Sequence, residues 1–159
     1  MQEQNAPARK RFDQALDLTK RTGDERLRSF VLRHIGYLQQ TDGQIDEAAT
    51  NFRESLALRQ RNHMKVFVPF AMILLAEFEA EQKHSTEAIK FAEQAVSLAK
   101  SGNSLRALYD GQLMLAKLYF GAGRAAEARN LAEQSRSGAE AFGNPADAKE
   151  AEDFLRKHP

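Results

Sequence analysis

The residues of this chain that could do chemistry lack the spacing of a catalytic or metal site. The four histidines, His34, His63, His84 and His158, are scattered, and no pair of them has the spacing of zinc ligands. The segment 121–123 is glycine-rich but lacks the preceding strand and the following lysine of a phosphate-binding loop. Cysteine is absent, which excludes disulfides, a thiolate nucleophile and cysteine-ligated zinc. We therefore expect no catalysis, no metal and no cofactor.

The stronger signal is a repeat with a period of 40 residues. Mostly apolar and small residues occupy equivalent slots in three successive copies without gaps. The first copy has Leu32, Ile35, Gly36, Gly43, Ala48, Phe52 and Ser55; the second has Met72, Leu75, Ala76, Lys83, Ala88, Ala92 and Ala95; the third has Gln112, Leu115, Ala116, Gly123, Ala128, Ala132 and Ser135. A fixed period in this range is typical of stacked repeats, which usually bind other chains.

Length and composition indicate one folded domain, residues 1–159, of 28% charged and 42% hydrophobic residues. The net charge of +1 provides no overall field for nucleic acid or an anionic membrane. The longest apolar run, 66–76, is too short to span a membrane and contains Pro69. The polar N-terminus and the missing cysteine favour a cytoplasmic protein.

Apolar residues three and four positions apart predict helices throughout, in antiparallel pairs joined by short turns. Asp24 and Ser104 are candidate caps of the helices that follow them. Pro69 predicts either a kink or a late start of its helix, because it lacks a backbone donor. The predicted first helices are 24–40, 64–82 and 104–120, and the predicted second helices are 44–61, 85–101 and 124–141.

The chain thus reads as repeats 24–63, 64–103 and 104–143, with a half repeat at 6–23 and a mostly polar capping helix at 145–157. Gly36, Ala76 and Ala116 on the first helices predict close approach of the paired backbones. The half repeat leaves a face without an obvious cover. Either the chain is an excerpt of a longer protein, or that face meets something else.

These slots resemble the tetratricopeptide repeat (TPR), whose pattern is W-x2-L-G-x2-Y, then A-x3-F, then P. The first copy matches it with Leu32, Ile35, Gly36 and Gln39, then Ala48 and Phe52. The tryptophan and the closing proline are missing, and the period is longer than the usual 34. The resemblance implies an all-α, right-handed superhelical solenoid of antiparallel helix pairs that binds peptides on a concave face lined by the first helices. Longer repeats of this kind occur in bacterial signal-responsive regulators and in cargo-binding light chains of motor proteins.

One face of the predicted first helices therefore holds the candidate peptide-binding residues. Aromatic side chains there would supply buried area, and arginines would pair with carboxylates. The opposing interpretation is that the aromatic stripe packs as core, and the sequence leaves both open. The candidates are Arg26, Phe30, Arg33, Tyr37, Phe70, Ile73, Glu77, Arg106, Asp110, Leu113, Lys117 and Phe120.

Two other ligand classes are less well supported. The lysine and asparagine clamp with which some TPR domains grip acidic tails is not matched, since only Arg33 is chemically close. Basic clusters at 9–11, 20–21 and 59–61 lie on outward-facing second helices and are interrupted by acidic residues, which argues against RNA. The expected partner is a protein or peptide, another domain of a longer parent chain, or a second copy of this chain. The alternative function is a peptide-sensing regulatory arm of a larger signalling or transcription-regulating protein.

Overall fold

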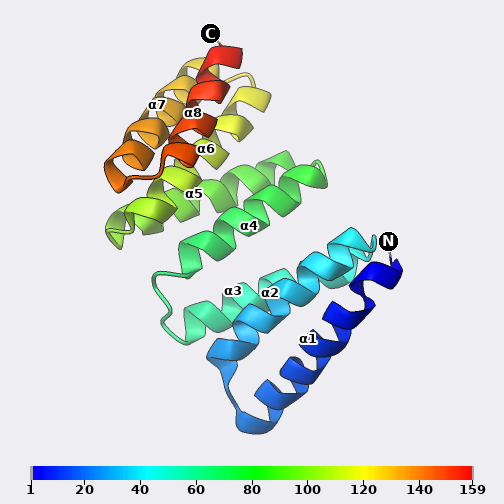
Figure 1. Cartoon of the computed structure of the whole chain (residues 1–159). Helices are drawn as coiled ribbons and strands as arrows, with labels where there is room; N and C mark the ends of the chain where they lie inside the picture. Colours follow the sequence, from blue (N-terminus) through cyan, green and yellow to red (C-terminus); the bar gives the residue numbers. More distant parts are fainter. Residues whose placement is uncertain (1, 159) are drawn as a thin grey trace. The chain divides into compact units, whose positions relative to one another are not determined.

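The computed structural model describes residues 2–158, with side chains from residue 7 onward, and this part of the chain is all-α, as predicted (Figure 1). The chain divides into two compact units, Met1–Phe67 and Val68–Pro159. No helix in the described part is long and apolar enough to cross a membrane. The helices are α1 (Gln2–Thr22), α2 (Glu25–Thr41), α3 (Ile45–Arg61), α4 (Val68–Glu81), α5 (Ser85–Ser101), α6 (Leu105–Gly121), α7 (Ala125–Phe142) and α8 (Pro145–Lys157).

The predicted helix boundaries are confirmed to within a residue for α2, α3 and α5 to α8. The exceptions are α1, which was expected to begin at residue 6 and begins at Gln2, and α4, which was expected to begin at Met64 and begins at Val68. Pro69 is then the second residue of the helix, where its missing N–H leaves no hydrogen bond unmade. The prediction of a late helix start is confirmed. Of the two predicted caps, Asp24 accepts a hydrogen bond from the Leu27 N–H at 2.9 Å, whereas the Ser104 side chain makes no such bond.

The turns between successive helices repeat every 20 residues. In each one, the N–H after the turn donates to the carbonyl five residues earlier, from Asp24 to Thr19 at 3.1 Å through to Asn144 to Ala139 at 2.9 Å. This is the Schellman arrangement, which needs a residue in the left-handed region. That residue is Gly23, Gly43, His63, Lys83, Asn103, Gly123 and Gly143 in turn.

Lys83 is strained in this role, since it has a φ of 64° and its side chain is exposed. Replacing Lys83 by glycine is expected to raise the free energy of unfolding by about 1 kcal/mol, because glycine adopts the left-handed conformation without steric cost. Chemical denaturation measures the change. The control is Lys90→Gly at an exposed position inside α5, which is expected to cost about 1 kcal/mol. A loss of stability in Lys83→Gly would contradict the prediction.

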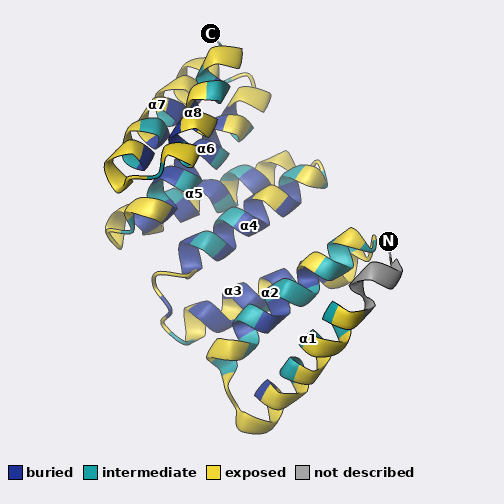
Figure 2. Ribbon diagram, viewed as in Figure 1, coloured by how far each residue is buried: buried dark blue, intermediate teal, exposed yellow. Residues whose placement is uncertain are grey.

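The first unit consists of α1, α2, α3 and the segment 62–67 that follows α3. Its core lies between α2 and α3, and α1 is mostly exposed (Figure 2). Gly36 allows the two helices to approach, because a Cβ placed there would lie 2.5 Å from Cε1 of the buried Phe52 ring. The Ser55 hydroxyl also donates to the Ser29 carbonyl at 2.6 Å.

The second unit consists of α4 to α8, and its core is rich in alanine (Figure 2). Ala76, Ala116 and Ala132 are fully buried there. The Ser135 hydroxyl donates to the Tyr109 carbonyl at 2.8 Å, which repeats the Ser55 bond 80 residues later. α8 packs against α7 with Ala148, Ala151 and Phe154 buried, and its other positions are mostly exposed, as expected of a cap. The proposed repeat boundaries and the single-domain organisation remain predictions.

Candidate functional site

The candidate binding residues lie on the first helices of the pairs. Four are on α2 in the first unit, and eight are on α4 and α6 in the second. Leu113 is buried, at 7% exposed. The other eleven are half-buried or exposed, including both Phe30 and Phe70.

The second unit brings five of these residues together around a cavity of about 220 Å³. α4 contributes Ile73 and Glu77, and α6 contributes Asp110, Leu113 and Lys117. The cavity therefore has apolar side chains beside charged ones. The remaining lining residues are Tyr109, Met114, Ser135, Asp147 and Glu150.

The charged groups of this cavity are predominantly acidic. Glu77, Asp110, Asp147 and Glu150 contribute carboxylates, whereas Lys117 is the one lysine or arginine among the described lining residues. Lys117 is already bound to Glu150, with Nζ to Oε1 at 2.6 Å. An additional cation in the cavity would therefore meet uncompensated negative charge.

Asp110 shows this excess most directly. Burial raises the pKa of its carboxyl to about 6, and the nearby carboxylates of Asp147 and Glu150 contribute to the rise. Arg106, one turn earlier on α6, opposes the rise from an Nε–Oδ2 distance of 3.8 Å. Arg106 thus acts on the cavity through Asp110 without lining it.

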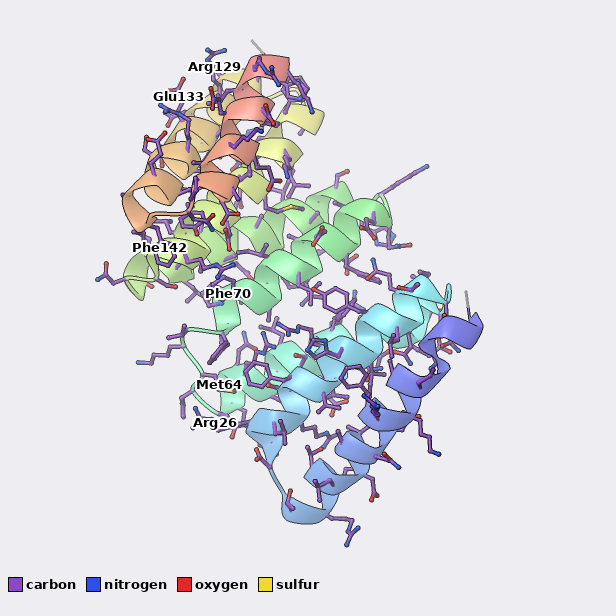
Figure 3. The ribbon with its side chains drawn as sticks, in the orientation of Figure 1. Arg26, Met64, Phe70, Arg129, Glu133 and Phe142 are labelled. Carbon is purple, nitrogen blue, oxygen red and sulfur yellow. The ribbon has the colours of Figure 1, made fainter. Side chains whose placement is uncertain are left out.

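The structure places Phe120 in a separate hollow of about 460 Å³, toward the end of the second unit. Its ring lies 3.9 Å from that of His158, centroid to centroid, and contacts Phe154 edge-on. Lys117 lines both hollows. Phe70 is on α4 (Figure 3) and is not among the lining residues of the acidic cavity.

In the first unit, Phe30 is part of an aromatic and cationic cluster. Its ring packs edge-on against Phe67 at 5.1 Å, and the Arg59 guanidinium lies over it at 4.9 Å from the centroid. The Arg33 guanidinium contacts His34 at 3.0 Å, and the His34 ring is stacked on Phe12. Arg26 is exposed and lies at the end of this unit that also holds Met64 (Figure 3).

Comparison with known proteins identifies the fold. No family model matches the chain, and no curated protein sequence matches it. One similar solved structure contains the nearly identical TPR-like repeats of a putative kinesin light chain from Podosopora anserina. The match has a TM-score of 0.65 and 18% sequence identity, and it covers 92% of this chain and 82% of that one. The chain has a TPR-like repeat fold. A point variant of the same repeats matches with a TM-score of 0.65 and 17% identity, over 92% of this chain and 82% of that one.

A third solved structure has the same TPR-like architecture. BtubC (BKLC) from P. vanneervenii covers 93% of this chain at a TM-score of 0.60, with 14% identity over 78% of its own length. At such low identity the likeness concerns the fold.

Arg59 is the residue that the sequence interpretation missed. It was assigned to an outward-facing basic cluster, and this is wrong, because the side chain is 1% exposed. The repeat pattern could have predicted that Arg59 is buried. The equivalent slots are Thr19, 40 residues before Arg59, and Ala99 and Ala139, 40 and 80 residues after it, and all of these are buried.

Proposed function

We propose that this chain is a protein-interaction scaffold, not an enzyme, and that the first helices of its TPR-like repeats bind a peptide segment of a partner. The observation that carries the proposal is the cavity in the second unit, which is lined by five of the residues that the resemblance to the TPR predicts for binding. The partner segment belongs to another protein, to a second copy of this chain or to another part of a longer parent chain. Whichever it is, the cavity sets the same chemical requirements.

The chemistry of the cavity specifies the kind of peptide. Ile73, Leu113 and Met114 offer an apolar surface for an aliphatic or aromatic side chain. Glu77 and Asp110 favour a lysine or arginine next to it, because a cation relieves the repulsion among the carboxylates. We therefore propose a segment with an apolar residue adjacent to a basic one.

Selection from a random peptide library on the wild-type chain tests this proposal. Selected peptides are expected to pair apolar with basic residues, and fluorescence anisotropy gives their affinities. Asp110→Lys is expected to weaken binding about tenfold or more, since it replaces a charge-assisted contact by repulsion.

The matched control is Glu133→Lys, which reverses an exposed carboxylate on α7 (Figure 3), away from the cavity lining. It is expected to bind the selected peptides with wild-type affinity. Equal losses in both variants, or selected peptides without basic residues, would refute the proposed site. Helical circular dichroism must be the same for all three proteins.

A further inference from the structure

Arg59 is a buried cation without an anionic partner among the described residues. Its Nη1 donates to the Phe67 carbonyl at 3.2 Å, and its Nε and Nη2 are buried without any hydrogen-bond partner among the described residues. Its guanidinium also contacts the face of the Phe30 ring. An aromatic face offsets only part of the lost hydration of a guanidinium.

The surroundings of Arg59 add positive charge. Burial and the charge of Arg33 lower the pKa of the Arg59 guanidinium to about 10. Burial, Arg33 and Arg59 together also lower the pKa of His34. The Nε of Arg33 is a further buried donor for which the described part of the chain supplies no hydrogen-bond partner. Three groups that bear or could bear positive charge thus gather with no carboxylate bound to Arg33 or Arg59 within the described chain.

Such an arrangement is costly for the free protein. An unpaired buried charge destabilises the fold, and an apolar side chain of similar size would normally be better tolerated. The equivalent slots of the repeat show that the fold does not require a cation, since they hold Thr19, Ala99 and Ala139. A cost that the Phe67 hydrogen bond and the Phe30 ring offset only in part is expected where a residue serves a ligand.

We propose that Arg59 and Arg33 form an anchor for a carboxylate of an acidic partner segment. The inference rests on the proposed function, because it names a group that the scaffold recognises, but it depends on residues of the first unit alone. A carboxylate matches two guanidinium groups because its two oxygens accept up to four hydrogen bonds. It would satisfy the orphaned donors and neutralise the mutual repulsion of the two arginines.

A carboxylate would reach the two arginines past the aromatic side chains that lie beside them. Phe67 lies in the segment after α3, is 39% exposed and packs on the Phe30 ring that lies under Arg59. Because the Nε and Nη2 atoms are closed off in the free chain, binding must include rotation of a neighbouring side chain. Such rotamer changes are common at interfaces, and the exposed Phe67 has the most freedom to make one.

The test uses a short glutamate-rich peptide and its glutamine counterpart as probes. The glutamate peptide is expected to shift the Nε–H resonance of Arg59 in a proton–nitrogen NMR spectrum and to raise Tm, whereas the glutamine peptide is expected to do neither. Inorganic sulfate is titrated in parallel, and a response to sulfate equal to that to glutamate would overturn the assignment to a carboxylate.

Three variants complete the test. Arg59→Met is expected to have a higher Tm than the wild type without ligand and to bind the glutamate peptide about tenfold more weakly or worse. Arg33→Gln is expected to lose binding similarly. If Arg59→Met does not fold, the affinity of Arg33→Gln for the glutamate peptide decides whether the proposal holds. Arg61→Gln is the control, because Arg61 is exposed on the same helix and pairs with Glu25; it is expected to bind as the wild type does.

Wild-type affinity in Arg33→Gln, or in a folded Arg59→Met, would overturn the proposal. The result of this test can be distinguished from the result of the peptide-selection test on the acidic cavity. Asp110→Lys lies in the second unit and is expected to leave the Arg59 resonance shift intact. A glutamate response without any selected basic peptide would therefore uphold the arginine anchor and refute the cavity.

Discussion

Replacing Phe52 by alanine is expected to lower the free energy of unfolding by about 3–5 kcal/mol. The ring is 1% exposed and fills the space that Gly36 leaves between α2 and α3. It also packs edge-on against Tyr37 at 5.4 Å between centroids. Removing it leaves a cavity in the main packed layer of the first unit, and denaturant unfolding measures the loss.

A double-mutant cycle shows whether Gly36 and Phe52 act together. Gly36→Ala alone is expected to cost about 1–3 kcal/mol, because the added Cβ would overlap the Phe52 ring. In the Phe52→Ala background the same change is expected to stabilise by up to about 1 kcal/mol, since alanine is the better helix former.

The control is Gly121→Ala at the end of α6, where a new Cβ would meet nothing within 4 Å. That change is expected to be neutral or slightly stabilising. If the changes in the free energy of unfolding caused by Gly36→Ala and Phe52→Ala simply add, the close packing of the Phe52 ring against Gly36 is not what requires a glycine at this position.

Replacing Asp110 by asparagine is expected to raise the free energy of unfolding by about 1–2 kcal/mol at pH 7. The folded pKa of about 6 lies above the ordinary aspartate value of 3.8, so the folded chain binds this proton more tightly than the unfolded chain. The contribution of Asp110 to stability therefore falls as the pH rises from about 4 to about 6. Above this window the charged group opposes folding, and below it the effect vanishes.

Denaturation curves between about pH 4 and about pH 8 check this expectation. The difference between Asp110→Asn and the wild type should grow through the lower half of that range and then level off. Asp13→Asn, the same change at an exposed position on α1, is expected to stay within about 0.5 kcal/mol throughout. A difference for Asp110→Asn that does not change with pH would show that the carboxyl does not titrate between these limits.

Much of the fold could be predicted from the sequence because each repeat carries its own local signals. Helix periodicity and turn residues act over a few positions, and so the helix limits were found to within a residue wherever no proline intervened. Lys83 shows the limit of this reasoning. It takes the left-handed position of its turn without being a typical residue for it, and only its place in the 20-residue series of turns reveals its conformation.

The candidate site was predictable only in part. Spacing along one helix determined that Ile73 and Glu77 share a face, and that Asp110, Leu113 and Lys117 share another. It did not show that Asp147 and Glu150 of α8 would add their carboxylates, because that depends on how a helix more than 30 residues away in the chain packs. The cavity and its acidity come from this packing.

The sequence by itself thus determined the all-α repeat architecture and the helix pairs, since these follow from periodic and local chemistry. The tertiary structure decided which charges meet. Arg59 illustrates the difference: its residue type suggested a solvated surface, while the packing of α3 against α2 and the segment 62–67 removes its guanidinium from water. Desolvation depends on every neighbour in space, and no pattern along a single helix contains that information.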